Sequence, residues 1–362
     1  MDRRSFLRTS TVGGAAAAAS TTLAAPLYAQ GNRTLTMVTS VPDGFAIFDD
    51  AAQLAADRIT ALTDGQLTIQ KMPAGSLVGA FEVFDAVSSG QADIYHSADY
   101  YFLNQHPAFA FFTSVPFGMT GQEFANWYYH RGGHEHHNNL ASLFNLRSFA
   151  CGCTAMQPGG WFNTEINSAE DLQGLRFRMP GQGGQVLGRL GASVQNIPGG
   201  EIYQALSSGQ IDGAEWIGPY ADERMGFQEV TNLYYTSGFH EPGSVLTLSF
   251  NNDVFESLTP QQQLLVDTVT RAVYADNLSL TLAENGAALA RLQEAGVQTR
   301  EFPDDVWNAF GAAAAEVREE NMGDPIYAEI AESYFGSLAE SASWFDLADG
   351  NYMDQRNRVN AG

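Results

Sequence analysis

Residues 82–93 read Glu-Val-Phe-Asp-Ala-Val-Ser-Ser-Gly-Gln-Ala-Asp, and residues 201–212 read Glu-Ile-Tyr-Gln-Ala-Leu-Ser-Ser-Gly-Gln-Ile-Asp. Each stretch has the apolar spacing of a short amphipathic helix, with a glycine directly after its end and an apolar strand beyond it. Because a solenoid needs at least three shorter repeats, two copies at this distance indicate two similar α/β lobes. A cleft between the lobes is the place to look for function.

Both lobes are expected to alternate strands and helices with short connections, a pattern that predicts parallel sheets. The elements of the first lobe are expected at residues 34–39, 45–62, 66–72, 81–88 and 92–97. Those of the second lobe are expected at 176–179, 186–190, near Val194, over the repeat helix and at 211–215. About 330 residues after the N-terminal segment are enough for two cores.

The chain changes character at Thr259-Pro260, a helix cap followed by Pro at the first helical position. A helix of about 30 residues is predicted from there toward Leu292, and one strand near 297–302. The remaining tail is mostly helical and keeps its aromatic residues, so we expect it to pack against another surface rather than extend freely into solvent. These aromatic residues are Tyr327, Tyr334, Phe335, Trp344 and Phe345.

The N-terminus indicates the compartment. Residues 2–8, Asp-Arg-Arg-Ser-Phe-Leu-Arg, form a twin-arginine run that leads into an Ala-rich stretch and a Leu27-Tyr28-Ala29 cleavage site. The alternative, a basic amphipathic start to the fold, lacks a helical stripe. The stretch is also too short and too weakly apolar to span a membrane. Residues 1–29 are therefore expected to be a twin-arginine signal peptide for export to the periplasm.

The composition excludes one class of partner. The formal net charge is −23 and Lys71 is the single lysine, so nucleic acid is not expected to bind. Such acidity suits a salty environment or a cationic ligand, but we favour a role in solubility. A disulfide between Cys151 and Cys153 would be strained and would enclose almost no loop, so two small buried thiols on one strand face are expected.

Three charged residues fall where a ligand site is expected. Arg178 and Glu215 stand at the carboxyl ends of two strands of the second lobe, and Glu241 lies where the chain crosses back between lobes. In open α/β sheets ligands bind outside the strand carboxyl ends, and an arginine there can bind a carboxylate bidentately, through two parallel hydrogen bonds. Two glutamates would over-neutralise it unless a cation such as Na⁺ or Ca²⁺ also binds. The plain alternative is a structural Arg–Glu salt bridge.

Two other patterns carry less weight. Four histidines crowd residues 130–137, but Gly132-Gly133 interrupts the helix and no His-Glu-x-x-His motif exists. We interpret this segment as a solvated loop, with adventitious metal binding as the alternative. The run Gly181-Gln182-Gly183-Gly184 does not complete a dinucleotide-binding motif and is interpreted as a tight turn that lets a ligand approach Arg178. Gly-x-Ser-x-Gly nucleophile elbows are absent from the sequence.

The segments around these charged residues resemble the second lobe of TRAP-transporter solute-binding proteins. The resemblance rests on Arg-Phe-Arg-Met-Pro-Gly at 176–181, Asn-Ile-Pro-Gly-Gly-Glu-Ile-Tyr-Gln-Ala-Leu at 196–206 and Gly-Gln-Ile-Asp-Gly-Ala-Glu-Trp-Ile-Gly-Pro-Tyr at 209–220. The Pro-Gly-Gly-Glu, Glu-Trp-x-Gly-Pro-Tyr and His240-Glu241-Pro242-Gly243 variants resemble the branch that binds 2-oxo acids and lactate with a metal ion. The likeness covers nearly all of the chain after the signal peptide.

The resemblance implies a role for each site residue. It implies that Arg178 grips the substrate carboxylate, and that Gln157, Glu215 and Glu241 hold Na⁺ or Ca²⁺ with the backbone carbonyl of Trp216. Tyr100 and Tyr101 match first-lobe residues that close over the ligand. Pro158 departs from the family pattern and holds Gln157 in an extended backbone.

The implied protein is a two-lobed α/β receptor of the periplasmic-binding-protein fold, with long inter-lobe and C-terminal helices and no catalytic activity. Its partners are a small carboxylate, the membrane permease subunits and a second copy of the chain in a homodimer. The expected divisions are lobe I at 30–155 and about 244–275, lobe II at 156–243 and about 276–325, and a C-terminal helical extension at 326–362.

Two other classes of function stay open at this stage. An exported hydrolase would use Glu215 and Glu241 as an acid/base pair, but an arginine and a metal beside both carboxyls would lower their pKa values rather than raise one. A receptor for dicarboxylates or other acids without metal would keep Arg178 and need no cation. The sequence does not choose between pyruvate, lactate and longer 2-oxo acids, or between Na⁺ and Ca²⁺.

Overall fold

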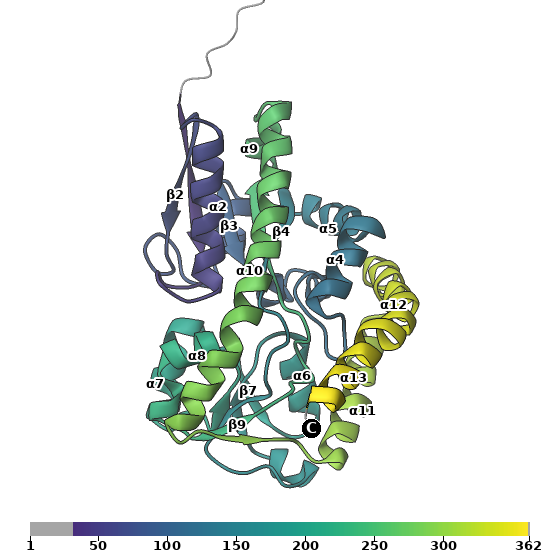
Figure 1. Ribbon diagram of the computed structural model, residues 1–362. Helices are drawn as coiled ribbons and strands as arrows, with labels where there is room; N and C mark the ends of the chain where they lie inside the picture. Colours follow the sequence, from purple (N-terminus) through teal and green to yellow (C-terminus); the bar gives the residue numbers. More distant parts are fainter. Residues whose placement is uncertain (1–31, 361–362) are drawn as a thin grey trace, which may run out of the picture. The chain divides into compact units, whose positions relative to one another are not determined.

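The structure, a computed structural model, describes residues 32–360, and the chain from Thr34 onward forms one compact unit (Figure 1). The signal-peptide prediction lies outside the described residues. Within residues 32–360, no helix combines the length and the apolarity needed to cross a bilayer.

The first sheet has five strands in the order β2-β1-β3-β10-β4. Their bounds are Leu67–Met72, Arg33–Thr39, Ile94–Ser97, Val245–Asn251 and Leu146–Cys153. The helices α2 (Phe48–Leu62) and α3 (Val83–Ser88) connect the first three strands, as the alternating pattern predicts. The apolar positions of α2 and α3 are buried. The 3-10 helix η1 (Asp99–Phe102) follows β3 with one residue, Ala98, between them.

The second sheet has six strands in the order β11-β9-β5-β8-β6-β7. Their bounds are Gln298–Arg300, Leu233–Tyr235, Gly160–Phe162, Gly213–Ala214, Arg176–Arg178 and Ser193–Gln195. The helix α6 (Gly181–Arg189) links β6 to β7, and α7 (Ile202–Ser207) precedes β8. The two repeat segments thus form α3 and α7, each packed beside a strand of its own sheet.

The prediction of parallel sheets is wrong for two strands. β1 pairs parallel with β3, and β6 pairs parallel with β7 and β8, but β10 and β5 are antiparallel to their neighbours. The cause is that each enters its sheet directly from the other sheet, β5 after β4 and β10 after β9. Such a strand starts at the carboxyl ends of the resident strands, since Thr247 pairs with Ser97 and Trp161 with Ala214. It must then run in the opposite direction.

The long helix begins where the cap predicts and continues further than expected. α10 spans Pro260–Glu294, and Thr259 caps it by accepting a hydrogen bond from the Gln262 amide at 3.2 Å. It packs on β4 and α2 of the first sheet and on α8 (Pro219–Met225) beside the second, and it is the long green helix of Figure 1. The remaining helices are α4 (Gly121–His130), α5 (Gly133–Ser142), α9 (Asn252–Glu256) and α11 (Asp304–Glu320).

The C-terminal helices only partly meet the packing expectation. α12 (Pro325–Phe345) buries Tyr327 and Tyr334, and the Tyr334 hydroxyl accepts a hydrogen bond from the Met119 amide at 2.6 Å. In contrast, Trp344 is 68% exposed. The π-helical turn η6 (Asp346–Gly350) and α13 (Asn351–Asn360) contain no buried residue, so the end of the tail does not pack against the rest of this chain.

The cysteine expectation is confirmed. Cys151 and Cys153 are free, buried thiols two positions apart on β4. Alternate residues of a strand face the same side of the sheet, so both thiols contribute to the same packed layer. Burial raises the pKa of both thiols, that of Cys153 to about 11, so they are poor nucleophiles.

Candidate functional site

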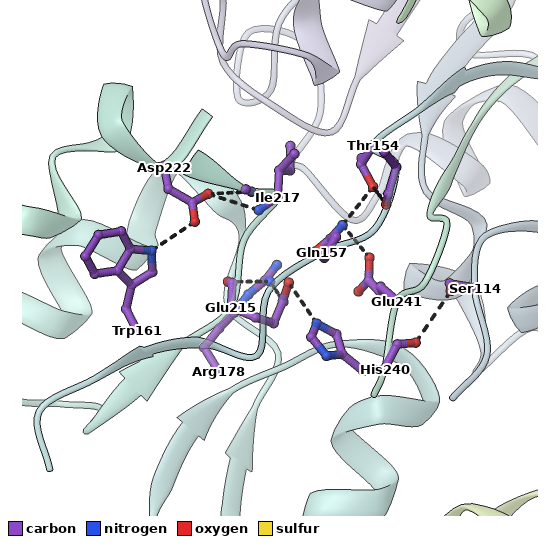
Figure 2. Close-up of polar contacts among 12 residues, drawn as sticks. Ser114, Thr154, Gln157, Trp161, Arg178, Glu215, Ile217, Asp222, His240 and Glu241 are labelled. Atoms are coloured by element: carbon purple, nitrogen blue, oxygen red, sulfur yellow. Dashed lines mark hydrogen bonds and ion pairs between the residues drawn. The ribbon is translucent and has the colours of Figure 1, made fainter. Parts of the chain in front are cut away.

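The geometry of the second sheet explains why Arg178 and Glu215 meet. Arg178 is the last residue of β6, and Glu215 directly follows β8, the strand beside it. The Glu215 amide donates to the Arg178 carbonyl at 3.3 Å, which holds the two residues together. Arg178 Nη1 is hydrogen-bonded to the Glu215 carboxylate, and both side chains are fully buried (Figure 2).

Gln157 and Glu241 lie on the two segments that connect the sheets. The Gln157 amide donates to the Glu241 carbonyl at 3.0 Å, and the Gly238 amide donates to the Gln157 carbonyl at 2.9 Å, so the two segments run side by side. The Gln157 side-chain amide donates to Glu241 Oε2 at 2.7 Å and to Thr154 Oγ1 at 3.0 Å (Figure 2). Both side chains are therefore fixed beside the Arg178–Glu215 pair.

The aromatic residues of the predicted site enclose the same place. The Tyr101 hydroxyl accepts a hydrogen bond from Arg178 Nη2 at 3.4 Å, and the Tyr100 and Tyr101 rings are stacked 4.8 Å apart on η1. The Arg178 guanidinium lies 5.5 Å from the centre of the Trp216 ring. A Cβ on Gly181, the first residue of α6, would collide with the Tyr100 ring. Every side chain that the sequence predicts for the site is brought to one buried region.

Three oxygen atoms in this region have no hydrogen-bond partner among residues 32–360. They are Gln157 Oε1, Glu215 Oε2 and Glu241 Oε1. A buried polar atom without a partner is costly, and carboxylate and amide oxygens are the ligands that hard cations such as Na⁺ and Ca²⁺ take. The donor set therefore fits a hard cation, and a cation would satisfy all three atoms at once.

Burial controls the charge states of these groups. Burial raises the pKa of Glu215 to about 7 against the attraction of Arg178, and it raises that of Glu241 to about 7 with repulsion from Glu215 added. Burial is the largest single influence on Arg178 and works against its charge, but the negative charge of Glu215 together with the Tyr101 and Tyr100 hydroxyls leaves the Arg178 pKa above its usual range. The region thus holds two carboxyls that are only partly ionised near pH 7, and a bound cation would favour their ionised forms.

Comparison with known proteins identifies the family. The family model for bacterial extracellular solute-binding proteins of family 7, DctP, matches residues 37–323. The chain is a member of the DctP family. A periplasmic protein of Nostoc sp. that is described as binding monocarboxylate 2-oxo acids is 37% identical to this receptor over 309 residues, which is 85% of each chain. The receptor therefore belongs to a periplasmic solute-binding family, whose members bind substrates and do not transform them.

Solved structures of TRAP solute-binding proteins share this fold. One, from Colwellia psychrerythraea with bound calcium and pyruvate, has a TM-score of 0.87 and 38% identity, and the match covers 90% of the receptor and 99% of that chain. Another, from Pseudoalteromonas atlantica with bound sodium and pyruvate, has a TM-score of 0.86 and 36% identity over 89% and 99% of the two chains. The predicted fold class and TRAP-receptor family are confirmed.

Two of the sequence interpretations are wrong. The segment Gly181-Gln182-Gly183-Gly184 is the first turn of α6 and not a separate tight turn, although Gly181 has the positive φ of 64° that the interpretation requires. Glycines are needed there because Cβ atoms on Gly183 and Gly184 would press on His240 and Met179.

The histidine-rich segment is not a solvated loop. Residues 133–142 form α5, and the glycine pair only separates α5 from α4. His137 is fully buried, with Nε2 2.8 Å from Asp99 Oδ2 and Nδ1 3.0 Å from the Tyr128 hydroxyl. Asp99 directly precedes the Tyr100–Tyr101 pair, so this histidine stabilises the backbone behind the site.

Sequence reasoning missed two site residues. His240 is fully buried, neither ring nitrogen has a hydrogen-bond partner among the described residues, and Nε2 lies 3.8 Å from Glu215 Oε2. Burial lowers the pKa of His240 to about 4, so the ring is neutral. His240, Glu215 and Glu241 form the only group of three or more acidic, His or Cys side chains within residues 32–360 whose ligand atoms all lie within 4.8 Å of one another. The other missed residue is Asp222, which lies behind the loop that carries Glu215 and Trp216.

Proposed function

We propose that the receptor binds a small 2-oxo or 2-hydroxy monocarboxylate, such as pyruvate or lactate, together with Na⁺ or Ca²⁺, and delivers it to the membrane subunits of a TRAP transporter. The observation that carries the proposal is the set of three buried oxygens without partners beside a buried arginine. The pyruvate and the calcium or sodium bound to the two similar receptors support the same chemistry.

In the proposed complex each group has a separate task. The side-chain oxygens of Gln157, Glu215 and Glu241 and the backbone carbonyl of Trp216 hold the cation. Arg178 binds the carboxylate of the ligand with its planar fork. Because Arg178 is bonded to Glu215 here, a cation that takes over the Glu215 charge frees the guanidinium for the ligand.

Tyr100 and Tyr101 cover the ligand when the lobes close. We assign lobe I to residues 30–155 and about 244–275, lobe II to 156–243 and about 276–325, and the helical extension to 326–362. The ligand favours the closed form by the difference between its affinities for the two forms. The closed form then presents a distinct surface to the permease.

We also propose export by the twin-arginine route, with residues 1–29 removed, and a homodimer formed through the C-terminal helices. The dimer is supported by large apolar side chains that α12, η6 and α13 leave exposed: Trp344, Leu347, Tyr352 and Val359. A truncation after Phe345 is expected to shift the protein from dimer to monomer in analytical ultracentrifugation. A truncated protein that still sediments with the mass of a dimer would contradict this arrangement.

Calorimetric titration of the metal-free protein tests the ligand assignment. We expect pyruvate or lactate to bind in the presence of Ca²⁺ or Na⁺ and to bind at least about 100-fold more weakly with a chelator in Na⁺-free buffer. Glu215→Gln is expected to abolish the dependence on the cation. The matched control is Glu301→Gln, which neutralises an exposed glutamate outside the proposed set of ligands.

A specific outcome favours the metal-free alternative. If a dicarboxylate binds tightly with or without cation and Glu215→Gln leaves its affinity unchanged, the receptor uses Arg178 without a metal. That result would refute the roles given to Glu215 and Glu241 and leave the family assignment intact.

A further inference from the structure

Asp222 is a fully buried carboxylate outside the proposed set of cation ligands, and one of its two oxygens is directed at the loop that bears two of them. It lies on α8, in the first turn. Its Oδ1 accepts hydrogen bonds from the amides of Ile217 at 3.1 Å and Gly218 at 2.9 Å. Its Oδ2 accepts from Trp161 Nε1 and from the Tyr234 hydroxyl, both at 2.9 Å.

The two oxygens of Asp222 therefore connect two parts of the fold. Trp161 lies on β5 and Tyr234 on β9, which are adjacent strands of the second sheet, and their rings are 4.3 Å apart. The loop of residues 215–218 has no regular secondary structure and follows a strand of only two residues. Asp222 thus links these two strands to the Ile217 and Gly218 amides, while Arg178 of β6 bonds the Glu215 carbonyl at the start of the loop.

The geometry of one peptide bond links Asp222 to the proposed cation site. The Trp216 carbonyl and the Ile217 amide belong to the same planar trans peptide, so they point in opposite directions. Since the Ile217 amide points to Asp222, the Trp216 carbonyl oxygen must point away from it. In Figure 2, Asp222 and Trp161 lie on one side of Ile217, and Gln157 and Glu241 lie on the other.

Gly218 completes this arrangement. Its φ of 157° and ψ of 173° belong to a region that only glycine occupies readily. This backbone conformation brings the Gly218 amide to the same Asp222 oxygen as the Ile217 amide. At the other end of the loop, the Glu215 amide is bonded to the Arg178 carbonyl. The loop is thus held at both ends, with Glu215 and Trp216 between them.

We propose that Asp222 is a positioning residue that orients the Trp216 carbonyl and the Glu215 side chain for the cation. The inference rests on the proposed cation site and extends it to a residue that would not touch the ion. The hydrogen bonds that Asp222 accepts from the loop amides determine cation affinity, whereas the bonds that it accepts from Trp161 and Tyr234 anchor it to the sheet. Residues that orient metal ligands without touching the metal affect metal affinity by about 10- to 100-fold.

The test measures Ca²⁺ affinity and pyruvate affinity separately. Asp222→Ala is expected to weaken Ca²⁺ binding by at least about tenfold. In the same variant at saturating Ca²⁺, pyruvate affinity is expected to stay within about threefold of the original protein, since Arg178 is unaffected. A general loss of structure would weaken both, so equal losses in the two affinities would overturn the proposal.

A rescue experiment covers the case in which Asp222→Ala fails to fold. In Asp222→Asn the amide group has one oxygen, so it must turn its NH₂ toward either the loop amides or the Trp161 N–H. Adding Trp161→Phe removes that N–H and lets the oxygen face the loop. Ca²⁺ affinity in the double variant is therefore expected to return to within about threefold of Trp161→Phe alone.

Tyr234→Phe is the matched control, because it removes one bond to Asp222 but none to the loop. It is expected to lower stability and to leave Ca²⁺ affinity within about threefold. Failure of Trp161→Phe to rescue Asp222→Asn contradicts the inference. Absence of both Ca²⁺ and Na⁺ binding by the unmutated protein contradicts the proposed function itself, so the two failures are distinguishable.

Discussion

Ca²⁺ affinity is expected to fall steeply between pH 8 and pH 6, because the cation must displace protons from two buried carboxyls. In the metal-free protein the pKa values of Glu215 and Glu241 are both raised to about 7, chiefly by burial. A cation binds only the ionised forms and releases the protons. The perturbation is a change of pH, with Glu241→Gln as the variant that removes one of the two titrating groups.

The magnitude follows from the two pKa values. A carboxyl with a pKa of about 7 is about nine-tenths protonated at pH 6 and about one-tenth protonated at pH 8, so each group costs about tenfold in apparent affinity. Two groups predict a fall of about 100-fold, and Glu241→Gln predicts about tenfold. At pH 7 about one proton is released for each Ca²⁺ bound, and about half a proton in the variant.

Calorimetric titration of Ca²⁺ in buffers of different ionisation enthalpy measures both quantities. The Glu241→Gln variant is expected to bind Ca²⁺ more weakly at every pH. The test therefore compares how steeply the logarithm of Ca²⁺ affinity changes with pH in the two proteins. A change of less than about threefold in affinity between pH 6 and pH 8, with no proton release, would refute the reasoning. Equal slopes for both proteins would exclude Glu241 as a titrating ligand.

Three further predictions concern protein stability, closure of the lobes and binding of the ligand carboxylate. In the metal-free protein the raised pKa of Glu241 contributes stability that is complete below about pH 4.5 and is lost as pH rises through about 7. At pH 8 the free energy of unfolding of Glu241→Gln, measured in urea, is therefore expected to exceed that of the original protein by about 3 kcal/mol. Gly200 is assigned to lobe II and Pro42 to lobe I, and the Cβ of Gly200→Ala would lie 3.1 Å from Pro42 and oppose closure. Ligand binding is therefore expected to weaken by about fivefold in the same calorimetric titration. Gly188→Ala, which has open space around its Cβ, is the control and is expected to leave binding unchanged. Arg178→Lys keeps the charge but loses the planar fork, so pyruvate affinity is expected to fall at least about tenfold with Ca²⁺ affinity retained; similar losses in both would contradict its role as the carboxylate clamp.

The repeated segment was enough to predict the two-lobed α/β fold because each copy fixes a helix and the strand after it by local pattern alone. The antiparallel entry of β5 and β10 was not predictable in the same way. It depends on which sheet a strand comes from, and this long-range connectivity leaves no mark in the apolar pattern of the strand itself. The short strand β8, with two residues, also carries too little pattern to fix its length.

Arg178 and Glu215 could be predicted from the sequence itself because each is a charged group at the end of a strand, and Glu241 because it lies where the chain crosses between the lobes. Gln157, Trp216, Tyr100 and Tyr101 were predicted only through the family resemblance. The site residues Asp222 and His240, and His137 behind the site, were missed because their roles depend on burial and on partners distant in the chain. The Asp222 bonds to Trp161 span 61 positions, and the His137 bond to Asp99 spans 38. A carboxylate on a short helix and a histidine among other histidines both resemble ordinary solvated residues until the fold buries them.

The most direct test of the account is the affinity of the metal-free protein for pyruvate, measured by calorimetry with a chelator in Na⁺-free buffer and again with saturating Ca²⁺. If Gln157, Glu215 and Glu241 hold a cation that the ligand needs, Ca²⁺ must increase pyruvate affinity by at least about 100-fold, and Glu215→Gln must remove that increase. The same pyruvate affinity with and without the cation would contradict the central claim.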